Sequence, residues 1–334
     1  MSVWVGLLAL VAADGGFLKG QLHLHSNGSG DSATPPADVV RWYAAHGYDF
    51  IVMTDHNVVT ASPSTPTMLV IPGVELTQNS AQCTPPPPPG MRCLLHMNAL
   101  FVSPPAGGAI PWSAPAGPSR LAIYRRALDA NRRLGGIAQL NHPNFHYAAD
   151  AALITQLAHE GLTLLEIANL SWDSNDHPTD QGRPSSEAIW DAVLTSGSQV
   201  FGTATDDAHH YFDAAAAAAR GEEVFPGDRG FVMVRSAPNP LAIRAALARG
   251  DFYASTGVFL KRIDHLGDRL EIEASDRSPG PHDFLFIGAG GRVLARAAGR
   301  QATFRLAGAS GGYVRALVAD RQGHHAWVQP IFVK

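Results

Sequence analysis

Short hydrophobic runs alternate with amphipathic segments over the first two thirds of the chain. From Leu22 to His25 leucine alternates with histidine, the pattern of a strand with two faces, so His23 and His25 should project from one face. Other hydrophobic runs predict six more strands, at residues 49–53, 68–71, 94–102, 136–140, 164–169 and 199–205. Between them, amphipathic helices are expected at residues 37–46, 120–134, 149–159 and 186–195. Because strands and helices alternate, the expected sheet is parallel.

The pattern changes after about Leu260. Short strands separated by Gly, Asp and Pro are expected around residues 270–274, 283–287, 303–306 and 313–319. This spacing is typical of a small antiparallel β-sandwich, for which we expect a supporting role. The alanine-rich segment at 213–220 predicts a helix that packs on the fold or acts as a lid.

Composition narrows the choice of partners. The chain has 334 residues, a formal net charge of −4 and 25 Lys and Arg without a run of them, so nucleic acid is not an expected partner. The chain has 15 histidines but 2 cysteines. This high histidine content suggests a specific role for these residues, and their positions in the chain indicate which role.

Histidines and acids fall at the ends of the predicted strands. His56 and His142 each follow a predicted strand closely, and Asp207 follows another. When a parallel sheet closes into a barrel, the carboxyl ends of its strands share one mouth, where such folds carry their chemistry. Imidazole and carboxylate ligands suit Zn, Mn or Fe. The alternative is a set of ordinary histidines, such as two on a half-exposed strand at His23 and His25.

These residues lie in motifs that resemble those of a known family. In chain order the motifs are His23–Ser26, Thr54–Asn57, Gly73–Glu75, His96, Asn141–Pro143 and Asp207–His209. They resemble the successive motifs of the PHP (polymerase and histidinol phosphatase) metallohydrolases, over about residues 20–257. His96–Leu100 and Phe252–Gly257 look most like the branch named after a bacterial carbaryl esterase. The resemblance implies a distorted, TIM-like (β/α) barrel of seven strands, in agreement with the strand pattern.

The resemblance also implies a site for two to three divalent metal ions, which would be Zn, Mn or Fe. One ion would be held by His23, His25, Glu75 and Asp207. Glu75 would bridge to a second ion, whose other ligands would be His96 and His142. A third ion would be held by Asp31, His56 and His209, with Asp31 standing where many family members have histidine. The expected catalytic residues are Asp31, Glu75 and His209.

The expected chemistry is metal-dependent hydrolysis. A carboxylate that bridges two dications holds them close, and a water shared between them loses its proton near neutral pH and attacks as a hydroxide. A phosphomonoester brings about two negative charges, which metals would have to balance in this lysine-poor chain. We therefore predict a phosphoesterase that hydrolyses small organic phosphates through a metal-bridging hydroxide at a di- or trinuclear site. Two alternatives stay open: a metal-dependent carboxyl or carbamate ester hydrolase, and a non-catalytic exported metal-binding protein.

Polar residues outside the motifs are further candidates. Asn169 ends the strand at 164–169, and Arg183 lies on a long polar loop where it can meet an anionic substrate. We expect both to bind substrate, with loop capping and a solvated surface arginine as the alternatives. Asp55 is a candidate to orient His56.

The start of the chain and its cysteines point to export. An apolar run ends at Ala13 in the manner of a secretory cleavage site, although the basic start of such a signal is missing. Cys83 and Cys93 bracket a proline-rich loop that a disulfide would close, with two free thiols as the alternative. We expect a periplasmic or secreted protein, or otherwise a cytoplasmic one, without a stable membrane span. The expected domains are a possible signal peptide at 1–13, a PHP-type metallohydrolase barrel at 14–259 and a small antiparallel β domain at 260–334.

Overall fold

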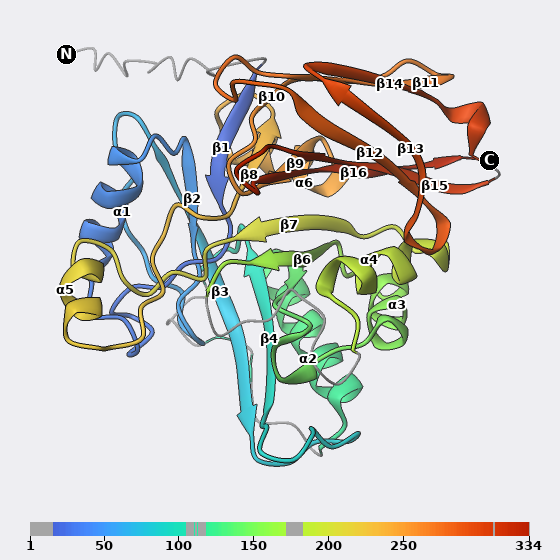
Figure 1. Cartoon of the computed structure of the whole chain (residues 1–334). Helices are drawn as coiled ribbons and strands as arrows, with labels where there is room; N and C mark the ends of the chain where they lie inside the picture. The colour runs from blue at the N-terminus through green and yellow to red at the C-terminus, as the bar shows by residue number, and fades with distance from the viewer. Residues whose placement is uncertain are drawn as a thin grey trace, which may run out of the picture.

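The computed structural model describes residues 16–104, 110, 112, 118–171, 183–309 and 311–333. It is a mixed α/β structure with one large mixed sheet, a second small antiparallel sheet and a few helices (Figure 1). The possible signal peptide at 1–13 lies outside the described residues. No helix in these ranges is long and apolar enough to cross a membrane.

Strands make up most of the regular structure. The first part of the chain contains β1 (Phe17–Gln21), β2 (Phe50–Met53), β3 (Leu69–Ser80), β4 (Cys93–Leu100), β5 (Ile137–Leu140), β6 (Leu164–Asn169), β7 (Phe201–Thr205), β8 (Phe231–Arg235) and β9 (Phe252–Ser255). The last part contains β10 (Leu260–His265), β11 (Arg269–Ala274), β12 (His282–Gly288), β13 (Arg292–Gly299), β14 (Gln301–Arg305), β15 (Gly312–Ala319) and β16 (His325–Val333). The α-helices are α1 (Pro36–Ala45), α2 (Arg120–Leu134), α3 (Ala151–His159), α4 (Ser186–Thr195), α5 (Ala214–Ala219) and α6 (Pro240–Arg249). The strand order in the large sheet is β13-β12-β15-β16-β9-β8-β1-β2-β3-β4-β5-β6-β7.

Neighbouring strands of the large sheet run in both directions. β1, β2 and β3 are parallel, and so are β5, β6 and β7. β8, a further strand, is antiparallel to β1. β4 is antiparallel to β3 and β5, so the prediction of a parallel sheet is wrong for these two pairs. The physical reason is the connection after β3. Residues 81–92 form a proline-rich loop that returns β4 directly beside β3, whereas a parallel pair needs a crossover.

The large sheet curls back on itself. β7 is the last strand in the order, yet it lies against β8 and β9 near the middle of the order. Within the described residues no hydrogen-bonded ladder joins β7 to β8. The expected closed barrel of seven strands is therefore not confirmed. β8, which the sequence pattern did not predict, occupies the place beside β1.

β1 lies before the first predicted strand rather than on it. It ends at Gln21, so His23 and His25 lie in the extended segment that follows it. An isolated bridge between Leu24 and Ala208 anchors this segment, and the main-chain N–H of His25 donates to Ala208 O at 2.9 Å. Residues 22–25 are all buried, so both faces of the segment lie in the interior. The alternative of two histidines on a half-exposed strand is wrong.

β3 is longer than predicted and contains Glu75. It continues through Pro72 because β2 pairs with its first half and β4 with its second half, from Gly73 to Ser80. Gly73 lies where the sheet is tightly packed, since a Cβ atom there would come within 2.6 Å of Val52 Cγ1. Glu75 lies in the second half of the strand, where it is paired with Asn98 of β4 on one side and forms an isolated bridge with His56 on the other.

Helix boundaries follow local capping. α2 and α4 have the predicted bounds, with Ser119 and Ser185 as N-caps that accept hydrogen bonds from the first turn. Gly135 ends α2 in the left-handed conformation, with φ 71°. Asp150 caps α3, so that helix begins two residues later than predicted. α1 begins and ends one residue before its predicted range, and α6 was not predicted.

The last strands form two facing sheets. β16 pairs with β9, so β12, β13, β15 and β16 extend the large sheet across the predicted domain boundary at residue 260. β10, β11 and β14 form the small antiparallel sheet. Phe286 of β12 and Phe304 of β14 stack with ring centroids 5.1 Å apart, as expected for apolar side chains between two sheets. Arg315 of β15 donates two hydrogen bonds of 2.7 Å to Asp191, which ties the sheet to α4.

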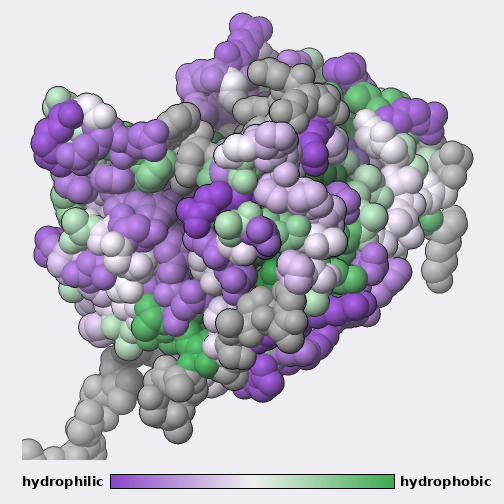
Figure 2. Space-filling model, turned by 90° about the horizontal axis from the view of Figure 1, so that it is seen from below, coloured by the Kyte–Doolittle hydropathy of each residue, from purple (hydrophilic) through white to green (hydrophobic). Residues whose placement is uncertain are grey.

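One face of the molecule is largely polar over one half of its area. Figure 2 shows the molecule from below, the side towards which β3 points in Figure 1. Hydrophilic residues dominate one half of this face, and hydrophobic residues form small separate areas. Among the described residues, the large hydrophobic side chains that are exposed are Val58, Phe212, Leu241 and Leu266.

Candidate metal centre

The side chains predicted as metal ligands converge on one place in the fold. His23 and His25 follow β1, His56 follows β2, Glu75 lies in β3, His96 lies in β4, His142 follows β5, and Asp207 and His209 follow β7. They form three groups, in each of which one potential ligand atom per residue lies within 4.8 Å of the others. We name these the first group (His23, His25, Asp207), the second group (Glu75, His96, His142) and the third group (His25, Asp31, His56, His209). Every residue predicted as a ligand belongs to at least one group.

Hydrogen bonds fix the tautomers of the two histidines in the first group. Nδ1 of His23 lies 2.6 Å from Oε1 of Glu166 and donates its proton to that carboxylate. Nδ1 of His25 lies 2.8 Å from Oγ of Ser29. Because the hydroxyl of Ser29 gives its own proton to Asp55, its oxygen accepts the proton of His25. In the neutral form of each ring, Nε2 is thereby the nitrogen that carries the lone pair.

These lone pairs face a carboxylate. The Nε2 atoms of His23 and His25 lie 3.2 Å apart, and they lie 3.2 and 3.0 Å from Oδ1 of Asp207. Burial, followed by the neighbouring His209 and His56, lowers the pKa of His25 to about 4, so its ring is neutral at pH 7. Burial opposes the charged form of His23, but Asp207, Glu166 and Glu75 outweigh it and raise the pKa of His23 well above its usual range. A proton on Nε2 of His23 therefore faces Asp207 in the metal-free protein, and a bound metal ion would take the place of that proton.

The second group repeats this arrangement. Nδ1 of His96 lies 3.1 Å from Oε1 of Glu75, while Nε2 of His96 donates to Oδ1 of Asn79 at 2.7 Å. Nε2 of His142 lies 3.7 Å from the same oxygen of Glu75. All three group members are buried, and burial lowers the pKa of His96, which favours its neutral form. The lone pair of His96 therefore points at a carboxylate oxygen.

The third group is open to solvent. Oδ2 of Asp31 lies 2.9 Å from Nε2 of His56 and 3.4 Å from Nε2 of His209. Nδ1 of His209 donates to the main-chain oxygen of Asp207 at 2.9 Å, which leaves Nε2 free to face Asp31. The side chain of Asp31 is 47% exposed, against 1% for Glu75. A substrate can therefore approach the buried groups past Asp31.

Glu75 connects the groups. Its Oε2 lies 2.5 Å from Nδ1 of His56, and its Oε1 lies 3.4 Å from Nε2 of His23. Burial opposes the charge of Glu75, but the neighbouring His56, His96 and His23 outweigh it and hold the pKa of Glu75 well below its usual range. The position is compatible with the bridging role that the resemblance implies. His25 differs from that expectation, because it takes part in the third group as well as the first.

Glu166 supports two of the groups. It is fully buried, accepts the ring proton of His23 and accepts the main-chain N–H of His142 at 2.7 Å. Thr205 donates to the same carboxylate at 2.7 Å. The sequence pattern did not reveal this role, although one signal was present: Glu166 is an acid with apolar neighbours on both sides in a buried strand.

Asp55 supports His25 rather than His56. Its carboxylate accepts hydrogen bonds from the main-chain N–H and hydroxyl of Ser26, both at 2.6 Å, and from the hydroxyl of Ser29 at 2.8 Å. The expectation that Asp55 orients His56 is therefore wrong. A Cβ atom on Gly28 would come within 2.5 Å of Oδ2 of Asp55, so this loop needs a glycine to close over the carboxylate.

The donor set fits divalent metal ions. It consists of imidazole nitrogens and carboxylate oxygens, and several of the imidazoles donate their second nitrogen to a polar partner, as metal-binding histidines do. In the described part of the chain, the ion pairs of Asp31, Glu75 and Asp207 are all with histidines. Lysine and arginine therefore do not neutralise these carboxylates. Protonated histidines do so in the metal-free protein, and bound metal ions would replace those protons.

The two predicted substrate-binding residues lie in different surroundings. The side-chain N–H groups of Asn169 donate to Glu166 at 3.0 Å and to Asp207 at 3.1 Å. The guanidinium of Arg183 stacks on the ring of Tyr147, 4.0 Å from its centroid. Arg183 and Tyr147 line a cavity of about 390 Å³ together with Pro85 and Leu153. Asn169 thus lies against the first group, and Arg183 lies at the rim of a cavity beside the loop after His142.

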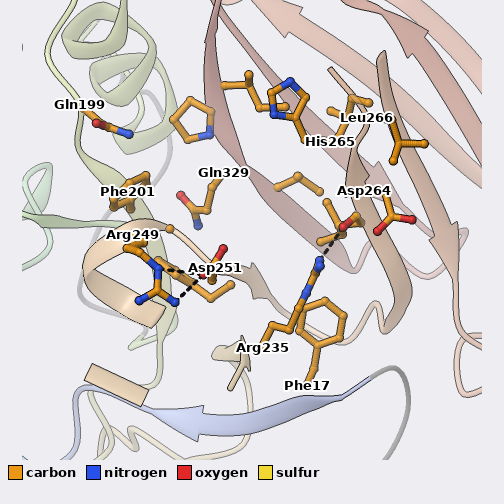
Figure 3. Close-up of a pocket in the computed structure, with 17 residues that line it drawn as sticks. Phe17, Gln199, Phe201, Arg235, Arg249, Asp251, Asp264, His265, Leu266 and Gln329 are labelled. Carbon is orange, nitrogen blue, oxygen red and sulfur yellow. Dashed lines mark hydrogen bonds and ion pairs between the residues drawn. The ribbon is translucent and has the colours of Figure 1, made fainter. Parts of the chain in front are cut away.

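A second cavity lies away from the ligands. It has a volume of about 430 Å³ and is lined by residues of β7, β9, β10 and β16 (Figure 3). Arg249 pairs with Asp251 at 2.7 Å, and Arg235 donates to the main-chain oxygen of Ile263 at 2.5 Å. None of the predicted ligands lines this cavity, so it is separate from the candidate metal centre.

Comparisons with known proteins give no family. No protein-family model and no curated protein matches the chain. Among solved structures, the chain is similar to an amidohydrolase from Chromobacterium violaceum with bound sulfate and no metal, with 16% identity over 57% of this chain and 87% of that chain and a TM-score of 0.36. It is also similar to an endonuclease/exonuclease/phosphatase from Beutenbergia cavernae DSM 12333, with 10% identity over 94% of this chain and 100% of that chain and a TM-score of 0.23. Scores this low support neither a family nor an activity.

Proposed function

We propose that this protein is a metal-dependent phosphoesterase that hydrolyses small organic phosphates. One observation carries the proposal: three groups of histidine and carboxylate ligands meet at one place, and one of them faces solvent through Asp31. Structural zinc sites usually rely on cysteine and close their coordination. This donor set has no cysteine and has an open side, which favours a catalytic site.

Charge favours a phosphate over a neutral ester. A phosphomonoester carries about two negative charges and spreads more over its equatorial oxygens in the transition state. When bound, divalent ions supply this positive charge and Lewis acidity towards the phosphoryl oxygens. Glu75 and Asp207 are buried and have pKa values well below the usual range, so they remain anionic and able to hold cations at neutral pH.

The residues of the open side have the expected catalytic roles in this proposal. Asp31 and His209 lie 3.4 Å apart where a substrate oxygen would arrive, and Glu75 holds the groups together behind them. Arg183 would bind an anionic part of the substrate from its place on Tyr147. Asn169 would act through Asp207, because its N–H groups already donate to Glu166 and Asp207.

The order of the sequence motifs supports a relation to the PHP metallohydrolases as part of this proposal. Each ligand motif contributes a side chain to at least one of the three groups, although β4 and β8 depart from a parallel barrel. Export to the periplasm or the medium is also proposed. It is supported by the disulfide between Cys83 and Cys93, a bond that persists in oxidising compartments.

A second candidate is a metal-dependent carboxyl or carbamate ester hydrolase. The observation that favours it is the cavity beside the His142 loop, where Pro85, Tyr147 and Leu153 form an apolar and aromatic lining. Such a lining suits an aryl leaving group. The two candidates share the metal groups and differ in the bond that is cut.

The test is a hydrolysis screen of metal-loaded protein against phosphomonoesters, phosphodiesters, aryl esters and carbamates. We expect inorganic phosphate to be released from small phosphomonoesters, and the His142→Ala variant to lose this activity. Efficient cleavage of aryl esters or carbamates, without phosphate release from a broad panel, would favour the second candidate. Metal binding without hydrolysis of any of these substrates would favour a non-catalytic metal-binding protein.

A further inference from the structure

The loop that carries His142 has an unusual backbone. Residues 141–150 connect β5 to α3, and His142, His146 and Tyr147 have φ values of 26°, 50° and 53°. Positive φ values are unfavourable for residues with a side chain. Three of them in six residues mean that contacts from outside the loop hold its shape. On one side the contact is with Glu166, which accepts the main-chain N–H of His142.

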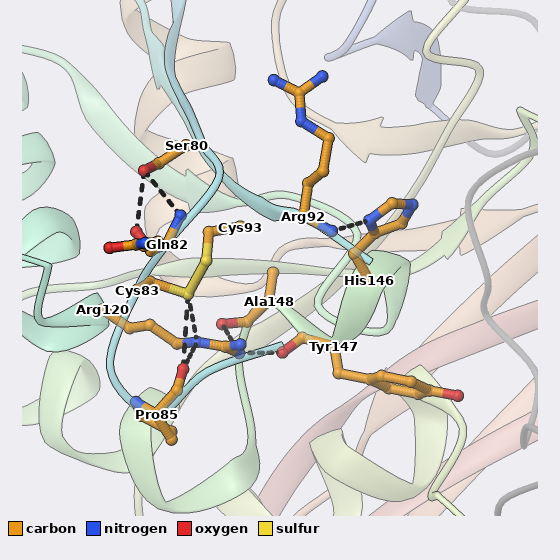
Figure 4. The surroundings of a disulfide bond; sticks show 10 residues. All are labelled: Ser80, Gln82, Cys83, Pro85, Arg92, Cys93, Arg120, His146, Tyr147 and Ala148. Carbon is orange, nitrogen blue, oxygen red and sulfur yellow. Dashed lines mark hydrogen bonds between the residues drawn. A yellow bond between two sulfur atoms is a disulfide. The ribbon is translucent and has the colours of Figure 1, made fainter. Parts of the chain in front are cut away.

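On the other side the contact is with Arg120, the first residue of α2. Its guanidinium donates from Nη1 to the main-chain oxygens of Tyr147 and Ala148, the latter at 3.2 Å (Figure 4). Its Nε donates to the main-chain oxygen of Pro85 at 2.8 Å and lies 3.1 Å from Sγ of Cys83. Arg120 therefore links the His142 loop to the loop between β3 and β4.

Arg120 is in an unfavourable place for a cation. It is 6% exposed, and within the described residues it forms no ion pair with a carboxylate. It also lies at the N-terminus of a helix, where the helix dipole disfavours positive charge. Burying a charge in this way is unfavourable unless hydrogen bonds compensate for it. Here the compensation comes from carbonyl groups of two loops, which the guanidinium joins.

The disulfide closes one of the two loops that Arg120 joins. Cys83 and Cys93 close the loop between β3 and β4, and the main-chain N–H of Arg92 donates to Nδ1 of His146 at 2.9 Å (Figure 4). β3 and β4 carry Glu75 and His96. The loop that joins two ligand strands of the second group therefore also contacts the loop that carries its third ligand.

We propose that Arg120 is a positioning residue for His142, and that the disulfide loop holds Arg120 in place. Arg120 does not touch the ligand atoms. It fixes the His142 loop against the loop between β3 and β4, so that Nε2 of His142 completes the second group with Glu75 and His96. This inference rests on the proposed function, because it assigns a support to one of the metal groups.

The experiment uses Zn²⁺ binding to chelator-stripped protein, measured by competition with a chromogenic chelator. The variants are Arg120→Met, which keeps the volume but removes the donors, and Arg120→Lys, which keeps the charge and part of the hydrogen bonding. Loss of such an outer support typically weakens metal affinity about 10- to 100-fold. We expect Arg120→Met to weaken the binding of one Zn²⁺ equivalent by this factor, and Arg120→Lys to weaken it less. Arg125→Met is the control, since Arg125 lies on the same helix but is exposed and pairs with Glu160.

A double-variant cycle separates positioning from general destabilisation. In a His142→Ala background, Arg120→Met should cause no further loss of Zn²⁺ affinity, because its target is gone. An equal loss with and without His142 would overturn the positioning role. If Arg120→Met does not fold, as judged by circular dichroism, the same cycle is run with Arg120→Lys. The double variant Cys83→Ser, Cys93→Ser should weaken the binding of the same Zn²⁺ equivalent.

The inference and the proposed function fail in different ways. Folded Arg120→Met that binds Zn²⁺ as tightly as the wild type overturns the positioning role, whatever substrate the protein cleaves. If the wild type binds Zn²⁺ in the second group but releases no phosphate, the phosphoesterase proposal is refuted. The effect of Arg120 on metal affinity can still be measured in that case.

Discussion

The carboxylate of Glu166 fixes which nitrogen of His23 is able to bind a cation. Its Oε1 accepts the Nδ1 proton at 2.6 Å, and Nε2 of the same ring lies 3.2 Å from Oδ1 of Asp207. Carboxylates thus lie on both sides of one buried imidazole. Glu166 orients the ring through Nδ1. Asp207 lies beside Nε2, and a bound cation would contact both this nitrogen and Asp207.

This relationship predicts the effect of Glu166→Gln. The variant removes the negative charge that holds the proton on Nδ1 of His23 and leaves the packing nearly unchanged. We expect metal affinity of the first group to fall by about 10- to 100-fold. The measurement is a Zn²⁺ titration of chelator-stripped protein, with the exposed Glu160→Gln variant as control. Equal affinities of Glu166→Gln and the wild type would show that Glu166 does not orient the ligand.

A second prediction concerns Asp31→Ala. Asp31 is the exposed member of the third group, so its loss should remove a cation that a phosphate needs more than a neutral ester does. We expect phosphoesterase activity to fall by about tenfold or more, and any aryl-ester activity to fall less. Asp38→Ala is the matched control, because Asp38 is an exposed acid on α1 that pairs with Arg41. Equal losses on both substrate types would remove the argument that links the third group to phosphate.

Metal binding should release protons at mildly alkaline pH. Burial opposes the charged form of His56, but Glu75 and Asp31 outweigh it and raise the pKa of His56 to about 10 in the metal-free protein. His56 is therefore protonated at pH 8, and it must lose that proton to bind an ion. Apparent metal affinity should consequently fall as the pH is lowered, since protons compete with the ion.

The proton release is measured by titration calorimetry at pH 8 in two buffers with different ionisation enthalpies. The observed binding enthalpy should differ between the buffers, and Asp31→Ala should release fewer protons because it removes one of the two carboxylates that hold the proton on His56. The same enthalpy in both buffers would show that His56 carries no proton to release.

The disulfide should be present and should stabilise the fold. Cys83 and Cys93 are bonded and 10 residues apart in the sequence. Closing a loop of this length is expected to contribute about 3 kcal/mol to the free energy of unfolding, by restricting the unfolded chain. The Cys83→Ala, Cys93→Ala pair should lose about this amount in urea unfolding. Titration of two free thiols in the denatured, non-reduced wild type would contradict the bond.

Local signals in the sequence placed most of the predicted ligands at strand ends, and the resemblance to the PHP motifs supplied the full set. His56, His142 and Asp207 follow hydrophobic runs closely, so they could be placed at strand ends from their neighbours alone, whereas Asp31 lies in a polar loop. The helices α2 and α4 were equally accessible, because Ser119 and Ser185 are local capping residues. The ligand groups thus depend on patterns that span only a few residues.

Contacts between distant parts of the chain could not be predicted in this way. Glu166 and His23 are 143 residues apart, and no local pattern pairs them. The direction of β4 depends on how the loop after β3 turns back, and the places of β8 and β16 depend on pairing with β1 and β9. Arg120 has the sequence context of an ordinary first residue of a helix, and its role emerges when the two loops that it joins meet.

Elemental analysis of protein purified without chelator tests the central claim most directly. Two to three equivalents of Zn, Mn or Fe per chain are predicted, and chelation should lower the thermal midpoint. An ion that binds the folded state alone adds about 2.7 kcal/mol to the free energy of unfolding when its concentration is about 100 times its Kd. Less than one equivalent of metal in freshly reconstituted protein, with no change in thermal stability on chelation, would contradict the claim that these histidines and carboxylates form a metal centre.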